Sequence, residues 1–328
     1  MQEHKLFYNT VLSQTFSNDG KYLLAGNIYG DISVYDLSKV LGPHKNDDNE
    51  LQGPSYKFTA YPDQYIESML ATENFLLIGT SGEISGWNWK TVTSSKAPKS
   101  KVSWTIQIPV NRDDFDKPTV NYMAYSNQDH MLYAGCGDNK IYVIDLEEGK
   151  ILRHYKGHTD YIHCLSLMGN KLASSSEDGT VRLWDLRKKE NTTILTPNLV
   201  EKVARPKLGK WIGAVDFTED WLLCGGGPKL SLWHTRTMEA ATVFDLQDQG
   251  IHVAKIYEER IIAAGASNQV HHMNYQGETL AKVQTSSNTV YSIIYQEAAQ
   301  KVLSIAGTSN NIDICTNFNY RGLTLKFA

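Results

Sequence analysis

The sequence contains little proline, little cysteine and no long hydrophobic run. Its 328 residues include only 9 Pro and 4 Cys. The cysteines, which form no CxxC pair, are Cys136, Cys164, Cys224 and Cys315. Their separation argues against a zinc site or a disulfide framework and predicts buried free thiols in a reducing compartment. No stretch approaches the ~18 consecutive apolar residues of a membrane-spanning helix, and Met1 to Thr10 lacks the apolar segment of a secretory signal. We therefore expect a chain of the cytosol or nucleus that makes no membrane contact.

The sequence also lacks an excess of positive charge. It carries 36 Asp and Glu against 32 Lys and Arg, a formal net charge of -4. Proteins that bind nucleic acid mainly through its backbone are usually basic, so a direct RNA contact is expected to be absent or weak. A hydrophobic content of 41% excludes a disordered chain. The 18 Tyr, 7 Trp and 9 Phe, set against so few prolines, favour β structure.

Seven short apolar runs, most of them ending in glycine, divide the chain. They begin at Leu23, Leu76, Leu132, Leu172, Leu222, Ile262 and Ser304. A second short strand follows each run, and these second strands end at Tyr35, Trp87, Ile144, Trp184, Trp233, Met273 and Cys315. Successive ends are 52, 57, 40, 49, 40 and 42 residues apart, against the ~40–45-residue period of WD40 repeats. Three intervals fit that period and three carry insertions.

Two further strands complete each repeat. Strands before the glycine runs are predicted at Val11 to Phe16, Tyr65 to Leu70, Tyr161 to Leu167, Trp211 to Phe217 and Val290 to Tyr295. Outer strands are predicted at Tyr56 to Ala60, Val102 to Ile106, Ile151 to Tyr155, Thr192 to Leu195, Ala241 to Phe244, Thr279 to Val283 and Leu323 to Phe327. Four strands repeated seven times predict an all-β, seven-bladed WD40 β-propeller with four antiparallel strands per blade.

We expect residues 1–328 to form a single propeller domain, with an N-terminal extension at 1–10 and insertions near 38–55, 90–118 and 196–210. Every blade can be filled from contiguous chain, including the last. The count therefore leaves no vacancy for a strand exchanged between the termini, and Met1 to Thr10 is expected only to lie across the closure of the ring.

One repeat, from Gly157 to Asp185, is close to the WD40 consensus. Its spacing predicts a buried hydrogen-bond network of His158, Ser174 or Ser176, Asp178 and Trp184, which would specify one packing of the blade. A Ser-His-Asp set could also suggest a hydrolase. We favour the structural interpretation, because the spacing is that of the blade and no G-x-S-x-G nucleophile motif is present. Blades with Ile144, Met273 or Cys315 at the tryptophan position are expected to rely on apolar packing.

Longer segments resemble the THO complex subunit 6 family. The similarity rests on Gly157 to Leu165, EDGTVRLWDLR (177–187), GKWIG (209–213) and DWLLCGGGPKLSLW (220–233), with AGNIYG (25–30) and Tyr320-Arg321 towards the ends. The resemblance implies a non-catalytic scaffold of THO, the core of the TREX assembly, which couples transcription and processing to nuclear mRNA export. It also implies a nuclear protein without cofactor that docks on the coiled-coil THO subunits 5 and 7.

Aromatic residues recur where the innermost strands begin. These are Tyr65, Tyr161, Trp211 and Tyr291, and Glu177 is expected to face the same side. Tyr and Trp are enriched at binding hot spots, so one interpretation is a partner-binding surface around one mouth of the channel. The alternative is packing between blades.

The sequence leaves other roles open. The tetrapeptide that ends in Arg187 resembles the WDxR box by which some propellers bind the cullin-4 ligase adaptor, with a bidentate contact from the arginine. The basic segment Leu199 to Lys210 could touch an RNA backbone, but it contains no aromatic residue for stacking, and a solvated loop is favoured. A propeller enzyme with a metal is the weakest alternative, because no recurring acidic or histidine set faces one opening. His271 and His272 are adjacent on a strand and point to opposite faces.

Overall fold

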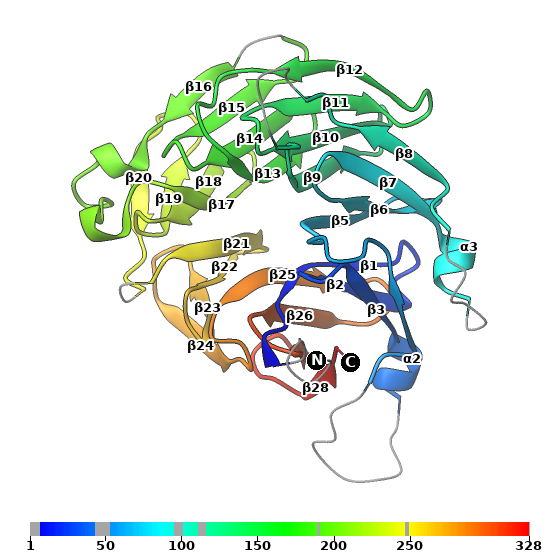
Figure 1. The fold of residues 1–328 in the computed structure, drawn as a ribbon. Coiled ribbons are helices and arrows are strands. Elements are labelled where there is room, and N and C mark those ends of the chain that lie inside the picture. The colour runs from blue at the N-terminus through cyan, green and yellow to red at the C-terminus, as the bar shows by residue number, and fades with distance from the viewer. Residues whose placement is uncertain are drawn as a thin grey trace. The chain divides into compact units, whose positions relative to one another are not determined.

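The computed structural model describes residues 7–42, 53–94, 101–110, 116–188, 191–246 and 249–327. These residues form seven four-stranded antiparallel sheets, each built from consecutive strands (Figure 1). The fold is the seven-bladed β-propeller that the repeats predicted. The chain groups into two compact units, Met1–Lys117 with Val283–Ala328, and Pro118–Lys282, which are called unit 1 and unit 2. That one domain spans the whole chain stays a prediction.

Unit 1 holds three sheets. The first consists of β1 (Val11–Phe16), β2 (Tyr22–Asn27), β3 (Asp31–Asp36) and β4 (Tyr56–Thr59). The second consists of β5 (Ser68–Ala71), β6 (Phe75–Gly79), β7 (Glu83–Asn88) and β8 (Trp104–Gln107). The third consists of β25 (Val290–Gln296), β26 (Val302–Gly307), β27 (Asn311–Cys315) and β28 (Leu323–Lys326).

Unit 2 holds the other four sheets, except for the last two residues of the final strand, which belong to unit 1. The first consists of β9 (Val120–Ser126), β10 (Met131–Cys136), β11 (Ile141–Asp145) and β12 (Lys150–Tyr155). The second consists of β13 (Ile162–Met168), β14 (Lys171–Ser176), β15 (Val181–Asp185) and β16 (Asn191–Leu195). The third consists of β17 (Ile212–Phe217), β18 (Trp221–Gly226), β19 (Ser231–His234) and β20 (Ala240–Val243). The fourth consists of β21 (Ile251–Tyr257), β22 (Arg260–Gly265), β23 (Gln269–Asn274) and β24 (Thr279–Gln284).

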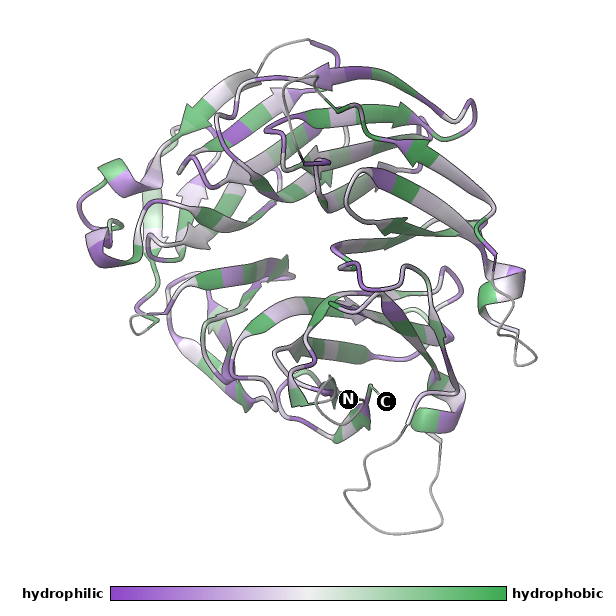
Figure 2. Ribbon diagram, in the orientation of Figure 1, coloured by the Kyte–Doolittle hydropathy of each residue, from purple (hydrophilic) through white to green (hydrophobic). Residues whose placement is uncertain are grey.

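The strands are held by apolar cores between neighbouring sheets of each unit. Figure 2 shows hydrophobic bands along the strands and hydrophilic colours in many of the loops. In unit 2 one core joins Trp184 to Tyr133 of the preceding sheet, and another joins Trp233 to Val215 and Cys164. Burying such side chains contributes about 25 cal/mol per Å² of apolar surface, which favours stacking of the sheets.

In unit 1 the first and last sheets meet without exchanging a strand. The buried Gln14 side chain accepts a hydrogen bond from Ser304 Oγ at 2.5 Å. Its amide nitrogen donates to the Ser292 carbonyl at 3.3 Å. The Tyr35 hydroxyl donates to the Lys326 carbonyl at 2.8 Å. Because β28 completes the last sheet from contiguous chain, side-chain hydrogen bonds and a shared apolar core hold this junction.

The described part of the N-terminal extension, residues 7–10, makes specific contacts beside this junction. The Asn9 amide nitrogen donates to Asn310 Oδ1 at 3.3 Å, and Asn9 Oδ1 accepts from Asn27 at 2.8 Å. Residues 1–6 of the predicted extension lie outside the described residues. Residues 7–10 thus contact both the first and the last sheet, and a role of the whole extension in the closure of the ring stays a prediction.

Two departures from the predicted strands have local causes. β5 begins at Ser68 rather than Tyr65, because the Ile66 amide donates to the Asn27 carbonyl of the first sheet instead of pairing in its own. Single helical turns, α2 (Leu37–Val40) and α3 (Trp89–Val92), open the first two insertions. Each is capped by the side chain of the residue before it, Asp36 or Asn88.

Much of the first two insertions, residues 43–52, 95–100 and 111–115, lies outside the described residues. The insertion at 196–210 is described in full. It contains the 3₁₀ turns η1 (Pro197–Leu199) and η2 (Pro206–Leu208), each started by a proline. Proline fixes the backbone angle that such a turn requires, so this segment has a defined shape.

Candidate partner-binding surface

Most inner strands start with a β-bulge at the same place. In unit 2 the pairing of β13, β17 and β21 with the next strand shifts after Ile162, Ile212 and Ile251. The extra residue in each is His163, Gly213 or His252. A bulge leaves its extra residue unpaired and redirects the side chain, so both histidines turn out of the regular alternation of the strand.

Trp211 precedes one of these bulges and is half-buried. Its ring stacks on His252, with ring centres 5.2 Å apart and an interplanar angle of 22°. His163 lies edge-on at 6.4 Å. The indole nitrogen donates to the Leu208 carbonyl at 2.9 Å. Gly250 lies under the ring, where a Cβ would be 2.8 Å from it, so only glycine permits this approach.

Two histidines lie next to the indole ring of Trp211. His163 Nε2 lies 2.8 Å from Glu177 Oε2, and the backbone of Glu177 donates to the Tyr161 carbonyl at 2.9 Å. Burial lowers the pKa of His252 to about 4, and the charge of His163 acts in the same direction. Trp211 therefore stacks on a neutral imidazole at pH 7. We call Tyr161, His163, Glu177, Trp211 and His252 the Trp211 edge.

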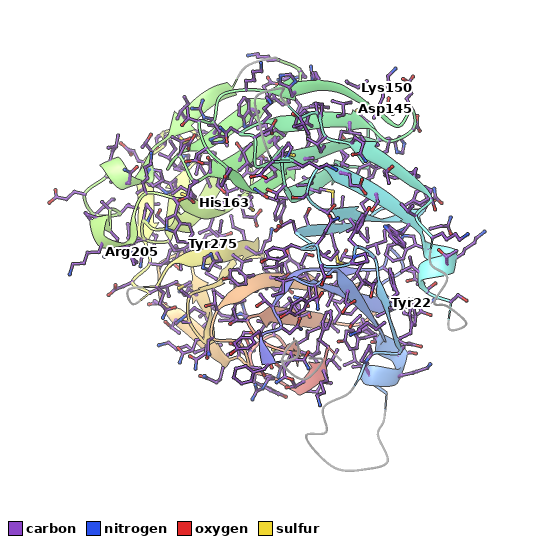
Figure 3. The ribbon with its side chains drawn as sticks, viewed as in Figure 1. Tyr22, Asp145, Lys150, His163, Arg205 and Tyr275 are labelled. Carbon is purple, nitrogen blue, oxygen red and sulfur yellow. The ribbon has the colours of Figure 1, made fainter. Side chains whose placement is uncertain are left out.

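The predicted surface residues of unit 2 meet at this edge. Glu177 reaches Trp211 through His163, and Tyr161 is 56% exposed beside them. His163 and His252 were not among the residues predicted from the sequence, although each comes directly after the isoleucine that starts its strand (Figure 3 labels His163). That position, two residues after Tyr161 or Gly250, was the available signal.

The predicted aromatic residues of unit 1 are exposed but not equivalent. Tyr65 is 55% exposed and Tyr291 is 37% exposed. The β25 pairing shifts after Val290, which makes Tyr291 the bulge residue. It therefore corresponds to His163, and Thr289 corresponds to Tyr161. Tyr291 thus stands one position later at the start of its strand than Tyr161 does in β13, and a common role of the four aromatic residues in binding stays a prediction.

The predicted structural network is a continuous chain of short hydrogen bonds. Trp184 Nε1 donates to Ser174 Oγ at 2.8 Å, and Ser174 Oγ lies 2.7 Å from His158 Nε2. His158 Nδ1 lies 2.8 Å from Asp178 Oδ2. Burial lowers the pKa of His158, with Asp178 opposing it in part. A neutral imidazole protonated on Nδ1 can donate to Asp178 and accept from Ser174, so all the hydrogen bonds from Trp184 to Asp178 run in one direction.

The burial and pairing of these groups favour a structural role for the network. Burial opposes ionisation of Asp178, but hydrogen bonds from His158 and Thr180 outweigh it, so its pKa lies well below its usual range. Ser174 is fully buried and already paired. Two other tryptophans at the same position keep a serine partner on their own strand, since Trp87 bonds to Ser85 and Trp233 to Ser231, both at 2.8 Å.

A second polar group links the inner strands of unit 2. Lys255 Nζ donates to the Tyr122 hydroxyl at 3.2 Å. Burial alone would lower the pKa of Lys255, but Tyr122 and Asp216 oppose it and the pKa lies well above its usual value. Asp216 in turn accepts from Ser166 at 2.7 Å and from the Ile256 amide at 2.9 Å. The four side chains come from the inner strands β9, β13, β17 and β21, so these contacts join the four sheets of unit 2.

Arg187 and the basic segment that contains Arg205, which the sequence also offered as contact sites, form bonds within the chain. The guanidinium of Arg187 makes two bonds of 2.8 Å to the carboxylate of Asp185, although the side chain is 71% exposed. Arg205 departs from the expected solvated loop, because it is buried against backbone carbonyls. Within the described ranges, no group of three His, Cys, Asp or Glu could hold a metal ion, and no helix is long and apolar enough to cross a membrane.

Comparison of the sequence with known proteins identifies the class of protein. Residues 149–185 match the family model described as "WD domain, G-beta repeat", so the chain is a WD40-repeat β-propeller. It is 37% identical over 322 residues to "THO complex subunit 6" of Drosophila melanogaster, covering 96% of this chain and 89% of that protein. It is 38% identical to the Danio rerio homologue over 98% of this chain and 99% of that protein, and 36% identical to the Homo sapiens protein over 97% and 93%. The chain belongs to the THO complex subunit 6 family.

Proposed function

We propose that this chain is a non-catalytic scaffold subunit of the THO part of TREX. In that role it serves transcription-coupled processing and nuclear export of mRNA by docking other proteins. The observation that carries the proposal is the identity of 36–38%, over nearly the full length, to proteins named as THO complex subunit 6. Residence in the nucleus follows from the same proposal.

The Trp211 edge is the proposed docking surface for other THO subunits, with the coiled-coil subunits 5 and 7 as the expected partners. A half-buried tryptophan that is held by a stacked ring and a hydrogen bond loses little freedom on binding. The neighbouring Tyr161 adds exposed aromatic surface, and Trp and Tyr dominate binding hot spots. The net charge of -4 suits a protein that serves RNA through protein partners.

A non-enzymatic role is supported by the state of the chemically active side chains. The Ser174–His158–Asp178 set is buried and bonded to itself and to Trp184. All four cysteines are buried, and burial raises the pKa of Cys224 and Cys315 to about 12. Thiols with such values stay protonated and unreactive at neutral pH.

The second candidate function is a substrate receptor of a cullin-4 ubiquitin ligase. The observation that favours it is the exposed Arg187 at the end of the WDLR segment. Its guanidinium would have to leave Asp185 to make a bidentate contact with an adaptor. That exchange of one ion pair for another brings little net affinity at an exposed site.

Substitution of Trp211 tests the docking proposal. In cells depleted of the endogenous protein, a tagged Trp211→Ala chain should recover about tenfold less of the other THO subunits, since loss of a hot-spot aromatic costs more than 1 kcal/mol. Trp221→Ala is the matched control, because Trp221 is also half-buried and contacts His234 and Tyr275, at the other end of the same strand pair. Equal recovery by the two variants would remove the Trp211 edge as a docking surface.

A further inference from the structure

Arg205 is a buried cation in the insertion that precedes β17 (Figure 3). The residue is 9% exposed. Its Nε donates to the Gly227 carbonyl at 2.8 Å. Its Nη2 lies within hydrogen-bond distance of three more carbonyls, those of Gly226 at 3.0 Å, Pro228 at 3.1 Å and Gln249 at 2.8 Å. One guanidinium therefore joins the turn between β18 and β19 to the segment that leads into β21.

The glycine-rich turn allows the insertion to lie directly on it. A Cβ on Gly227 would stand 2.4 Å from the Gly209 carbonyl oxygen and 2.6 Å from that of Leu208. A Cβ on Gly226 would stand 2.1 Å from the Trp211 carbonyl oxygen. Any larger residue would lift the insertion away from the turn. Gly227 is thus explained by the close approach of the insertion, and Gly226 by that of Trp211 and the start of β17.

The two segments that Arg205 joins also contact Trp211 on two sides, one at its backbone and one at its ring. The Gly227 amide, in the turn, donates to the Trp211 carbonyl at 2.8 Å and fixes its backbone. Gly250 and His252, one and three residues after Gln249, lie against the indole ring. No other described cation of the insertion makes such a set of bonds: Lys202 is exposed and donates to one carbonyl, that of Ala240.

We propose that Arg205 is the positioning residue of the Trp211 edge, acting through the turn and the β21 entry rather than by touching a partner. A guanidinium is suited to this task because its planar fork donates several bonds at fixed angles, which the ammonium of lysine does not. The consequence for binding rests on the proposed function. The positioning of Trp211 does not, and it can be measured on the isolated full chain.

The first experiment measures positioning. Full-length chain labelled with fluorotryptophan gives one resonance for each of its seven tryptophans, and Trp211→Phe assigns the one of interest. Arg205→Lys should shift and broaden that resonance and speed amide exchange about tenfold at residues 207–213, 226, 227 and 229, which corresponds to ~1.4 kcal/mol of local stability. Lys207→Gln, which removes an exposed charge from the same insertion, should change neither signal.

Two results would overturn the proposal. One is an Arg205→Lys chain with an unchanged Trp211 resonance, which would show that the fork is not needed. The other is faster exchange in every sheet together with the insertion, which would show a general loss of stability instead of local positioning. Arg205→Gln, tested alongside, separates loss of the charge from loss of the fork, and it should resemble Arg205→Lys.

The second experiment measures recovery of other THO subunits with the same variants. We expect about tenfold less recovery with Arg205→Lys, the loss expected for a misplaced hot spot. If Trp211→Ala lowers recovery while Arg205→Lys does not, the positioning proposal fails and the docking proposal stands. If neither lowers recovery while the Trp211 resonance shifts, the docking proposal fails and the positioning proposal stands.

Discussion

Acid pH should destabilise the fold through a buried histidine on β23. His272 is 1% exposed, and neither of its ring nitrogens has a hydrogen-bond partner among the described residues. Burial lowers its pKa to about 4, and the charges of Arg260 and His271 add to the effect. The perturbation we consider is His272→Leu, which fills a similar volume without any group that can be protonated.

The magnitude follows from the difference between folded and unfolded pKa values. The unfolded chain binds a proton at His272 near pH 6.5, whereas the folded chain resists it down to about pH 4. The unfolded state therefore binds more protons in this range, and stability falls as pH falls from 6.5 towards 4. The loss from His272 is about 2 kcal/mol at pH 5 and approaches about 3 kcal/mol below pH 4.

Urea unfolding at pH 7.5 and at pH 5 measures this effect. We expect wild type to lose stability between the two values, and His272→Leu to lose about 2 kcal/mol less. At pH 7.5 the variant should be as stable as wild type or more so, because an unpaired buried polar group has been removed. His154→Gln removes an exposed imidazole and should leave most of the pH dependence in place. An equal loss in wild type and His272→Leu would refute the reasoning.

Two further substitutions test the internal networks. His158→Ala should lower the free energy of unfolding by ~3–5 kcal/mol, because it leaves Asp178 and Ser174 buried without a main partner; partner recovery should persist at temperatures where the variant is folded, and its loss there would contradict a purely structural role. Gln14→Ala should cost about 1–3 kcal/mol and speed amide exchange first in β1 and β26. Exchange that rises equally in all sheets would contradict a role for Gln14 at the junction of the first and last sheets.

The strand order could be predicted because each repeat shows the same local pattern of residue types. Each inner pair combines an apolar run with a final Gly or Ser, and each third strand ends near a buried residue, which is a large aromatic one such as Tyr35 or Trp233 in four of the seven repeats. Those features arise from burial between sheets, which acts on every repeat in the same way. The consensus spacing of His158 and Asp178 likewise anticipated their contact.

The rest depended on contacts between distant segments. The sequence around Arg205 reads as a basic loop, and its burial becomes visible only when the carbonyls of Gly226 and Gln249 are placed beside it. The bulge at Tyr291 could not be predicted, because a bulge adds one residue to a strand without any mark in a single sequence. The helical turns α2 and α3 are too short to show a helical period.

Affinity purification of the tagged full-length chain tests the central claim most directly. The scaffold account predicts recovery of the other THO subunits, including subunits 5 and 7, without the cullin-4 adaptor, and unchanged recovery with Arg187→Ala. Retention of the adaptor that Arg187→Ala abolishes, with no THO subunit recovered, would contradict the account and support the ligase receptor instead.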